Sequence, residues 1–166
     1  MWTLILGGAL FFCFAYVGIG IRSYYAKRRD IYKDSVAYID YLKENIGFLK
    51  TPLGILTRNF CSDRKGELVK ILNRYVALID KGCLNSDSVN KLVSSPYIDK
   101  DRQDMFATFF YGLGKVDCDT QIEQLQRMRA ALVPLAEHYE KKYRTTGVLA
   151  YRLGILLGIA VMIIAV

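Results

Sequence analysis

The chain has 166 residues, of which 52% are hydrophobic, so it holds one modest domain together with an excess of apolar sequence. Its formal net charge of +7 raises the question of nucleic-acid binding. Eight of the 23 Lys and Arg residues lie beside the apolar ends, which leaves 15 for residues 30–140, where all 16 Asp and Glu residues lie. A nucleic-acid interface needs a basic face, so this nearly neutral middle segment disfavours that function.

The first apolar segment, residues 2–21, contains no charged residue. As a helix it would be about 30 Å long, which is enough to cross the hydrocarbon core of a bilayer. Basic residues follow it in RSYYAKRR, an order typical of an uncleaved anchor and not of a cleaved signal peptide. We predict a transmembrane helix at residues 2–21.

The second apolar segment, residues 147–166, contains Arg152, with 14 uncharged residues beyond it. A long Arg side chain can extend to the headgroups, and Tyr151 suits the same interface, so we predict a second transmembrane helix. A half-buried helix, or one packed on a partner, is the alternative.

Basic residues gather on the inner flanks of both apolar segments. They are Arg22, Lys27, Arg28, Arg29, Lys141, Lys142, Arg144 and Arg152. Under the positive-inside rule, this distribution places the central domain, residues 22–146, in the cytosol. The same side chains would attract anionic membrane lipid.

Between the membrane segments, apolar residues recur at spacings of three and four, which is typical of amphipathic helices. The first helix is expected to continue out of the membrane to Lys50. Thr51 as the N-cap and Pro52 as the first helical residue would then begin a second helix.

A third helix is expected to begin near Ser62 or Asp63 and to end at Gly82. Its apolar stripe is Leu68, Ile71, Leu72, Tyr75, Val76 and Ile79. A short fourth helix would be capped around Ser86 and end before Pro96.

A fifth helix would begin after Asp99 and end at Gly114. Its repeating apolar residues are Met105, Phe109 and Leu113. A sixth helix would begin near Asp117, with a buried stripe of Ile122, Leu125, Met128, Leu132, Leu135 and Tyr139. Pro134 should kink or divide it, because the proline ring clashes with the carbonyl group four residues earlier. The sequence thus predicts an all-α protein, with a compact cytosolic bundle of about six helices between an N-terminal and a C-terminal transmembrane helix.

The turn before the sixth helix, GKVDCDTQIE, concentrates residues that could carry chemistry. Asp117, Asp119 and Thr120 all favour N-cap positions, and Thr120 to Glu123 has the spacing of a capping box. The alternative is a divalent-cation or acid–base site, although no third oxygen ligand follows at a suitable spacing. We expect the turn to cap the helix.

No catalytic or cofactor-binding motif is recognisable in the sequence. His138 is the only histidine, and no Ser, Cys or Asp constellation provides its partner. Cysteines 13, 61, 83 and 118 form no CxxC pair, and the three in the central domain, Cys61, Cys83 and Cys118, are expected to be reduced thiols. We therefore expect no enzyme activity, no metal and no cofactor.

Gly154 and Gly158 form a GxxxG pattern in the last apolar segment. Such a face allows another helix to pack closely, here the first helix or a partner. Glycine is also common in membrane helices without such a role, and both interpretations stay open.

Three segments, TPLGILTRNF, DKGCLNSDSVNKL and FFYGLGKVDCDTQIEQL, together with the membrane helix and its basic flank, resemble the stage III sporulation protein AB family over essentially the whole chain. The most specific residues are Thr51, Pro52, Leu53, Gly114, Asp117 and Gln121. The soluble domain of that family is similar to the helical cytoplasmic domain of type II secretion and type IV pilus inner-membrane platform proteins. Those proteins typically carry two copies of the domain, whereas this chain has one.

The resemblance implies a non-enzymatic assembly or platform component of the mother-cell to forespore export complex needed for endospore formation, located in the mother-cell membrane around the forespore. It implies a cytosolic secretion-type ATPase and other integral membrane proteins of the complex as partners, and it leaves homo-oligomers open. The six turn residues would either dock a partner or set the angle between helices. The alternatives are a membrane-tethered structural hairpin without a motor partner and, less favoured, a membrane-anchored nucleic-acid binder.

Overall fold

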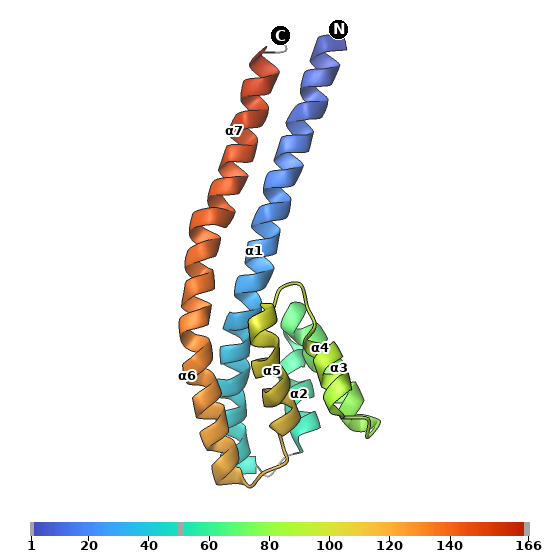
Figure 1. The fold of residues 1–166 in the computed structure, drawn as a ribbon, viewed down its shortest axis with the longest axis vertical. Helices are drawn as coiled ribbons and strands as arrows, with labels where there is room; N and C mark the ends of the chain where they lie inside the picture. The colour runs from blue at the N-terminus through green and yellow to red at the C-terminus, as the bar shows by residue number, and fades with distance from the viewer. Residues whose placement is uncertain (1, 50–51, 165–166) are drawn as a thin grey trace. The chain divides into compact units, whose positions relative to one another are not determined.

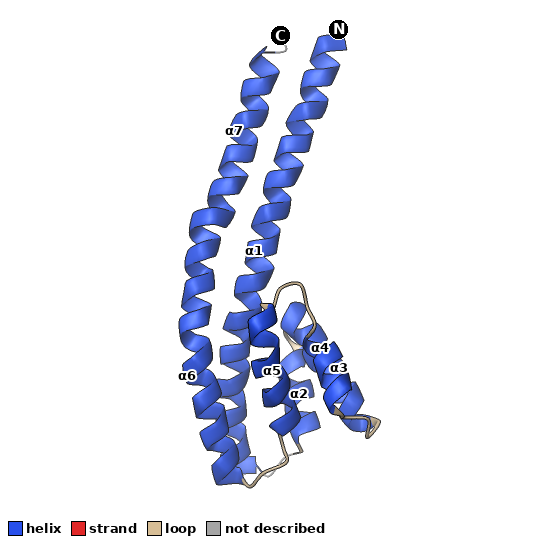
Figure 2. Ribbon diagram, viewed as in Figure 1, coloured by secondary structure: helices blue, strands red, loops and turns tan. Residues whose placement is uncertain are grey.

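A computed structural model of the chain describes residues 2–49 and 52–164. These residues form seven α-helices and one π-helical segment and contain no strand (Figure 1, Figure 2). The all-α prediction is therefore confirmed. The chain divides into two compact units, one formed by Met1–Arg29 with Glu137–Val166 and the other by Asp30–Ala136. We call the first unit the helix pair and the second unit the bundle.

The helix pair contains the first part of α1, which runs from Trp2 to Leu49, and the whole of α7, Val148–Ile164. These two stretches lie side by side, with both chain ends at the same end of the pair (Figure 1). By length and composition alone, Gly7–Asn45 and Cys118–Ile164 are each apolar enough to cross a membrane. The continuation of the first helix is confirmed as far as Leu49, and Lys50 lies outside the described residues.

Helix α6 runs from Cys118 to Lys142, so of the two predicted effects of Pro134 the division of the helix does not occur, and the kink stays a prediction. A proline leaves the carbonyl of the residue four positions earlier without its helical partner. That residue is Ala130, which is exposed, so water can satisfy its carbonyl group. The irregularity comes later, in the π-helical segment η1, Tyr143–Gly147.

The bundle contains residues 30–49 of α1, residues 118–136 of α6 and four shorter helices. These are α2 (Leu53–Ser62), α3 (Glu67–Asp80), α4 (Ser86–Val93) and α5 (Lys100–Gly112). Its core consists of large apolar and aromatic side chains, including Tyr32, Tyr38, Leu42, Leu72, Tyr75, Phe106, Phe110 and Leu125. Burying them supplies the main force that holds the short helices together.

Two buried tyrosines of this core have hydrogen-bond partners. The Tyr38 hydroxyl lies 2.8 Å from the Thr57 hydroxyl, and the Tyr75 hydroxyl donates to the carbonyl oxygen of Phe110 at 2.9 Å. Burial raises the pKa of both phenols well above the usual value, so both stay neutral. The bundle thus buries aromatic area without leaving these polar groups unsatisfied.

The start of α2 differs by one residue from the prediction. Pro52 is the N-cap and not the first helical residue, because its ψ of 135° is not helical. Its carbonyl oxygen accepts hydrogen bonds from the backbone N–H groups of Ile55 and Leu56 at 2.9 and 3.2 Å. Thr51, the predicted cap, lies outside the described residues.

The predicted start of α3 is wrong, while its predicted end is confirmed. Ser62 is the last residue of α2, and α3 begins after Gly66, whose φ of 154° disfavours other residues. At the other end Gly82 has a φ of 64°. There the N–H groups of Gly82 and Cys83 bond to the carbonyls of Ile79 and Leu78, the Schellman pattern.

Helices α4 and α5 begin close to the predicted places but are capped differently. The cap of α4 is Asn85 and not Ser86, and it forms a capping box with Ser88. Asp99 precedes α5 as predicted, yet it makes no side-chain cap to that helix. Its carboxylate instead accepts a hydrogen bond from the Tyr32 hydroxyl at 3.4 Å. This hydrogen bond joins the start of α5 to α1 within the bundle.

Candidate functional site

The turn between α5 and α6 is built around Gly114. Its φ of 76° lies in the left-handed region, which glycine adopts without steric cost. Just before it, Leu113 is buried, and its backbone N–H donates to the Phe109 carbonyl at 3.2 Å. The chain can therefore reverse sharply while one side chain stays anchored in the core.

Gln121 fastens this turn to α6. Its side-chain Oε1 accepts a hydrogen bond from the backbone N–H of Gly114 at 2.8 Å. Only 4% of Gln121 is exposed, so the bond is largely shielded from water. In addition, the Gln121 backbone N–H donates to the Asp117 carbonyl at 2.9 Å. One side chain thus fixes the distance between the end of α5 and the first turns of α6.

Asp117 caps α6. Its carboxylate Oδ2 accepts a hydrogen bond from the backbone N–H of Thr120 at 3.1 Å. The bonds from the Thr120 backbone and hydroxyl lower the pKa of this exposed carboxyl. The predicted capping box, with Thr120 as the N-cap and Glu123 three residues later, is therefore wrong, because the N-cap is Asp117 and α6 already begins at Cys118. Glu123 instead accepts a hydrogen bond from Arg127 at 2.6 Å, one turn further along.

Leu53, at the start of α2, lies against the same turn. A Cβ atom placed on Gly114 would lie 3.5 Å from Leu53 Cδ2, which is ordinary van der Waals contact. The structure therefore brings together Leu53, Gly114, Asp117 and Gln121, although more than 60 residues separate the first from the others. Pro52 begins the helix that carries Leu53.

The turn has no ligand set for a metal. Within residues 2–49 and 52–164, no three His, Cys, Asp or Glu residues lie close enough together to hold an ion. Asp119 stands in the first turn of α6, where a carboxylate interacts favourably with the helix dipole. The thiol of Cys118, the first residue of α6, is free and exposed.

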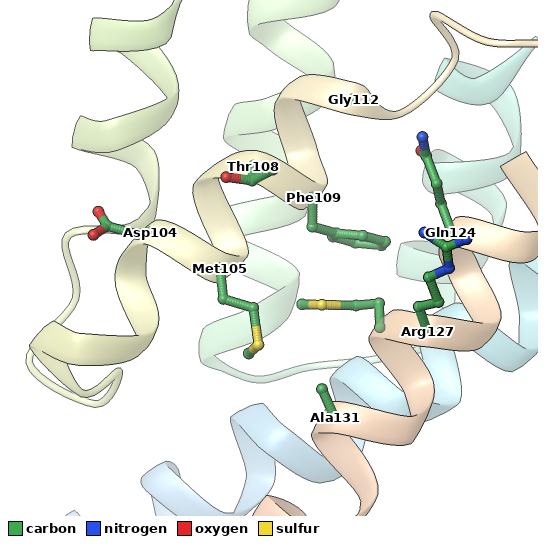
Figure 3. Close-up of a pocket in the computed structure, with 9 residues that line it drawn as sticks. Asp104, Met105, Thr108, Phe109, Gly112, Gln124, Arg127 and Ala131 are labelled. Carbon is green, nitrogen blue, oxygen red and sulfur yellow. The ribbon is translucent and has the colours of Figure 1, made fainter. Parts of the chain in front are cut away.

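A groove lies beside this turn, between α5 and α6 (Figure 3). Its volume is about 570 Å³, and its lining is mostly apolar. Nine residues line it: Asp104, Met105, Thr108, Phe109, Gly112, Gln124, Arg127, Met128 and Ala131. Because Gln121 and Gly114 hold the two helices at the turn, the same contacts shape the groove.

The groove separates the apolar residues of α5 into two sets. The buried residues of α5 are Phe106 and Phe110, whereas Met105 and Phe109 are only partly buried and line the groove. The sequence carried a signal for this difference, because α5 has two apolar stripes offset by one residue. Only one stripe can face the core of a helix on the surface of a bundle.

The glycines of α7 lie against α1 in the helix pair. A Cβ atom on Gly154 would lie 2.8 Å from the backbone oxygen of Phe14, and one on Gly158 would lie 2.7 Å from Cδ2 of Phe11. Gly18 of α1 is similarly close to the backbone of Tyr151. The absence of side chains on these residues permits the close approach of the two helices.

The basic residues predicted beside the membrane contact tyrosines within the helix pair. Arg28 lies over the Tyr139 ring, 4.7 Å from its centre, and donates to its hydroxyl at 3.2 Å. Arg29 lies 4.2 Å from the ring centre of Tyr143, and Arg22 donates to the Tyr143 hydroxyl at 3.4 Å. These five residues form what we call the Arg–Tyr collar. The hydrogen bond from Arg22 lowers the pKa of the Tyr143 phenol.

The remaining predicted basic residues lie outside the collar. Arg144 pairs with Glu140 at 2.6 Å, and Lys142 lies 5.8 Å from the Tyr139 ring centre. Lys141 and Arg152 are exposed, and Lys27 is half-buried. The sequence indicated these cations but not their contacts with the collar tyrosines, because those contacts join residues more than 100 positions apart.

The fold and these sites define an all-helical protein with two helices apolar enough to cross a membrane and a separate helical bundle. A model of the stage III sporulation protein AB family matches residues 3–166. No curated protein and no solved structure matches the chain. The chain belongs to the stage III sporulation protein AB family, which gives it a role in sporulation.

Proposed function

We propose that the chain is a non-enzymatic assembly component of the export complex between mother cell and forespore, anchored in the mother-cell membrane. Residues 2–21 and 147–166 of the helix pair cross that membrane, and the bundle, in the cytosol, docks a secretion-type ATPase. Family membership supports the sporulation role. The similarity of the family to secretion platform proteins, suggested by the sequence, supports the motor partner.

The observation that carries this proposal is the division of one chain into two units of different character. The helix pair exposes large apolar side chains, as a lipid-facing surface requires. In the bundle, in contrast, most of the exposed residues are polar, and the aromatic core is buried. The exposed apolar surface of the helix pair suits a membrane anchor, and the buried core of the bundle suits a cytosolic adaptor domain.

The test is binding of the full chain, in nanodiscs, to the cognate cytosolic ATPase. We expect saturable binding by the wild type. A double variant, Asp117→Ala with Gln121→Ala, is compared after circular dichroism has shown that its helices are intact. Loss of binding in this variant alone would make the turn a contact surface, whereas unchanged binding would make it a joint between helices. No binding by the wild type would contradict the motor partner and favour a structural hairpin.

A second measurement tests the topology. Cys83 and Cys118 are exposed in the bundle, so a thiol reagent that cannot cross membranes should label both only after lysis. The buried Cys61 should react slowly in either case. Labelling of Cys83 or Cys118 in intact cells would contradict a cytosolic bundle.

A further inference from the structure

The helix pair carries far more positive than negative charge. Residues 1–29 and 137–166 contain eight Lys and Arg residues but only two acids, one of which is Glu140. Glu140 is shared between two arginines, because it pairs with Arg144 at 2.6 Å and with Arg29 at 3.7 Å. The unit cannot neutralise its cations from within, so its surface attracts an anion from outside the chain.

Two of these cations, Arg144 and Arg152, have guanidinium nitrogens that the protein does not use. Arg144 bonds to Glu140 through Nε, and its side chain is 76% exposed. Arg152 is exposed and makes no hydrogen bond, ion pair or ring contact within the part of the chain that the structure describes. The arginines of the Arg–Tyr collar, in contrast, already contact tyrosines.

The contacts of the helix pair place both arginines on one stripe of the helix. Four residues at a constant spacing of four lie against α1: Tyr139, Tyr143, Gly147 and Tyr151. A spacing of four drifts around an α-helix, but a turn of the π-helical segment η1 takes in more residues and so keeps these four in line. The residues that follow them by one position form the adjoining stripe, which includes Arg144 and Arg152.

The next stripe around the helix is apolar where it enters the predicted membrane span. It contains Leu149 and Leu153, which are 55% and 47% exposed. The exposed surface thus changes from cationic to apolar within a short stretch of one helix. A phospholipid has the matching chemistry, because its charged phosphate adjoins its acyl chains.

We propose that Arg144 and Arg152 bind the phosphate of an anionic phospholipid in the cytosolic leaflet, with an acyl chain of this lipid along Leu149 and Leu153. The inference rests on the proposed function, since it requires the helix pair to cross the membrane. It adds a specific lipid site, formed by two of the eight cations, to the general attraction of the basic flanks.

The positions of the two arginines suit this role. Arg152 lies in the second turn of the predicted span, residues 147–166, where a charge without a partner is costly. Its long side chain extends toward the headgroups, and a lipid phosphate there offsets the cost. Arg144 lies just outside the span, at the level of the headgroups. The planar guanidinium group donates two parallel N–H bonds to phosphate oxygens, which an ammonium group cannot do.

The apolar stripe distinguishes a lipid from other anions. A soluble phosphate ion or a nucleic acid would meet the same cations, but it would leave Leu149 and Leu153 exposed to water. The ion pair between Arg144 and Glu140 does not block the site, because such an exposed pair contributes little and a phosphate can compete with the carboxylate.

The experiment compares two arginines that are alike except for the unit in which they lie. Arg144 and Arg127 have side chains that are 76% and 74% exposed, and each pairs at 2.6 Å with a glutamate four residues earlier. Arg144→Gln and Arg127→Gln therefore remove the same charge and the same kind of ion pair, but Arg127 lies in the bundle.

The full chain and its variants are purified in a neutral detergent, and their melting curves are matched to the wild type. Each protein is titrated with phosphatidylglycerol, with zwitterionic phosphatidylcholine or with soluble glycerol phosphate. Native mass spectrometry then counts the molecules that stay bound.

We expect the wild type to retain phosphatidylglycerol at concentrations at which the other two probes are lost. Arg144→Gln should weaken this binding about fivefold, and the double variant with Arg152→Gln about 20-fold, whereas Arg127→Gln should change it less than about twofold. Arg152→Lys keeps the charge, so it should retain more lipid than Arg152→Gln. Equal binding by these two variants would overturn the role of Arg152.

Three other results would overturn the lipid site and keep the membrane anchor. They are equal binding of phosphatidylglycerol and phosphatidylcholine, unchanged binding in the double variant, and an equal loss in Arg127→Gln. Glycerol phosphate bound as tightly as the lipid would assign the site to soluble phosphates instead. Flotation of the full chain with phosphatidylcholine vesicles tests the anchor separately, and a chain that does not float would contradict both the anchor and the lipid site.

Discussion

The helix pair and the bundle contain parts of the same two long helices, yet they pack in opposite ways. In the bundle, the contacts between helices consist of large buried side chains such as Tyr38, Leu72 and Phe106. In the helix pair, Gly154 and Gly158 bring the backbone of α7 against α1, and large side chains such as Phe12 point outward, 72% exposed. A core of large side chains is what burial in water favours, whereas close approach through small residues is typical of helices that pack together in a membrane.

The tyrosines of the two units also differ in the direction in which their surroundings shift the pKa of the phenol. In the bundle, Tyr38 and Tyr75 are buried with neutral partners, and burial raises the pKa of each phenol. In the Arg–Tyr collar, Tyr143 lies beside two guanidinium groups, and the pKa of its phenol is lowered. The same residue type thus fills the core of one unit and carries charge contacts in the other.

The largest effect should come from shortening a buried leucine of the bundle, compared with the same change at an exposed leucine of the helix pair. Leu72 is fully buried in the bundle, and Leu72→Ala should lower the free energy of unfolding by about 2–5 kcal/mol. Leu156 is 61% exposed on α7, and Leu156→Ala in detergent should cost much less. Urea unfolding of the full chain, followed by circular dichroism, measures both. An equal loss of unfolding free energy in the two variants would contradict the difference in packing between the two units.

The next effect tests the glycine contacts of the helix pair. Gly154→Leu would force a side chain into the backbone of Phe14, so the two helices must separate, at a cost of about 1–3 kcal/mol or more. Gly20 has no atom within 4 Å of its Cβ position, so Gly20→Leu is the matched control on the opposite helix.

These glycine variants are compared by thermal denaturation in one detergent. Gly154→Leu should lower the midpoint, and Gly20→Leu should leave it within a degree or two of the wild type. A normal midpoint for Gly154→Leu would show that the close approach of α1 and α7 is not required for the stability of the pair.

A smaller effect is expected in the turn of the bundle. Gln121→Met keeps the length of the side chain but removes the acceptor for the Gly114 N–H group, so it should cost about 1 kcal/mol. Amide hydrogen exchange at Gly114 should quicken by about fivefold in this variant, while exchange in α3 stays unchanged. Unchanged exchange at Gly114 would mean that this hydrogen bond does not hold the turn.

The sequence predicted the parts of the fold that depend on one helix at a time. The stripe of α3 is buried from Leu68 to Val76 because that helix has only one apolar face. For α5 the sequence left the inward face undecided, because two apolar stripes compete and only the packed bundle determines which of them faces the core. The prediction failed at Ser62 and Asp63, because several residues that favour caps lie together there and the chain uses Gly66.

The turn was partly predictable, because Asp117 and Gly114 have local conformational roles that short sequence patterns reveal. The partners of Gln121 and Leu53 were not, since their contacts depend on how α2 and α5 approach α6. The groove and the collar were missed for the same reason. Their residues acquire a common location only through tertiary packing, as Arg22 and Tyr143 do across 121 positions.

The smallest effect concerns the cap at Asp117, and it should depend on pH. Hydrogen bonds from Thr120 lower the pKa of this carboxyl below its ordinary value of 3.8. A group whose pKa is lowered by folding stabilises the protein fully above its unfolded pKa, and the stabilisation is lost as the pH falls through the folded pKa. Asp117→Ala should therefore lower the melting temperature slightly at pH 7, and the difference from wild type should shrink below about pH 4.

Asp117→Asn separates the charge of this cap from its hydrogen bond. Asparagine is also a good N-cap, so the variant should stay close to wild type at pH 7 and keep the same difference from Asp117→Ala at every pH. Melting curves of the three proteins at pH 7, 5 and 3 make the comparison. If the difference between wild type and Asp117→Ala does not change with pH, the carboxylate charge contributes nothing to the cap, and the turn relies on Gly114 and Gln121.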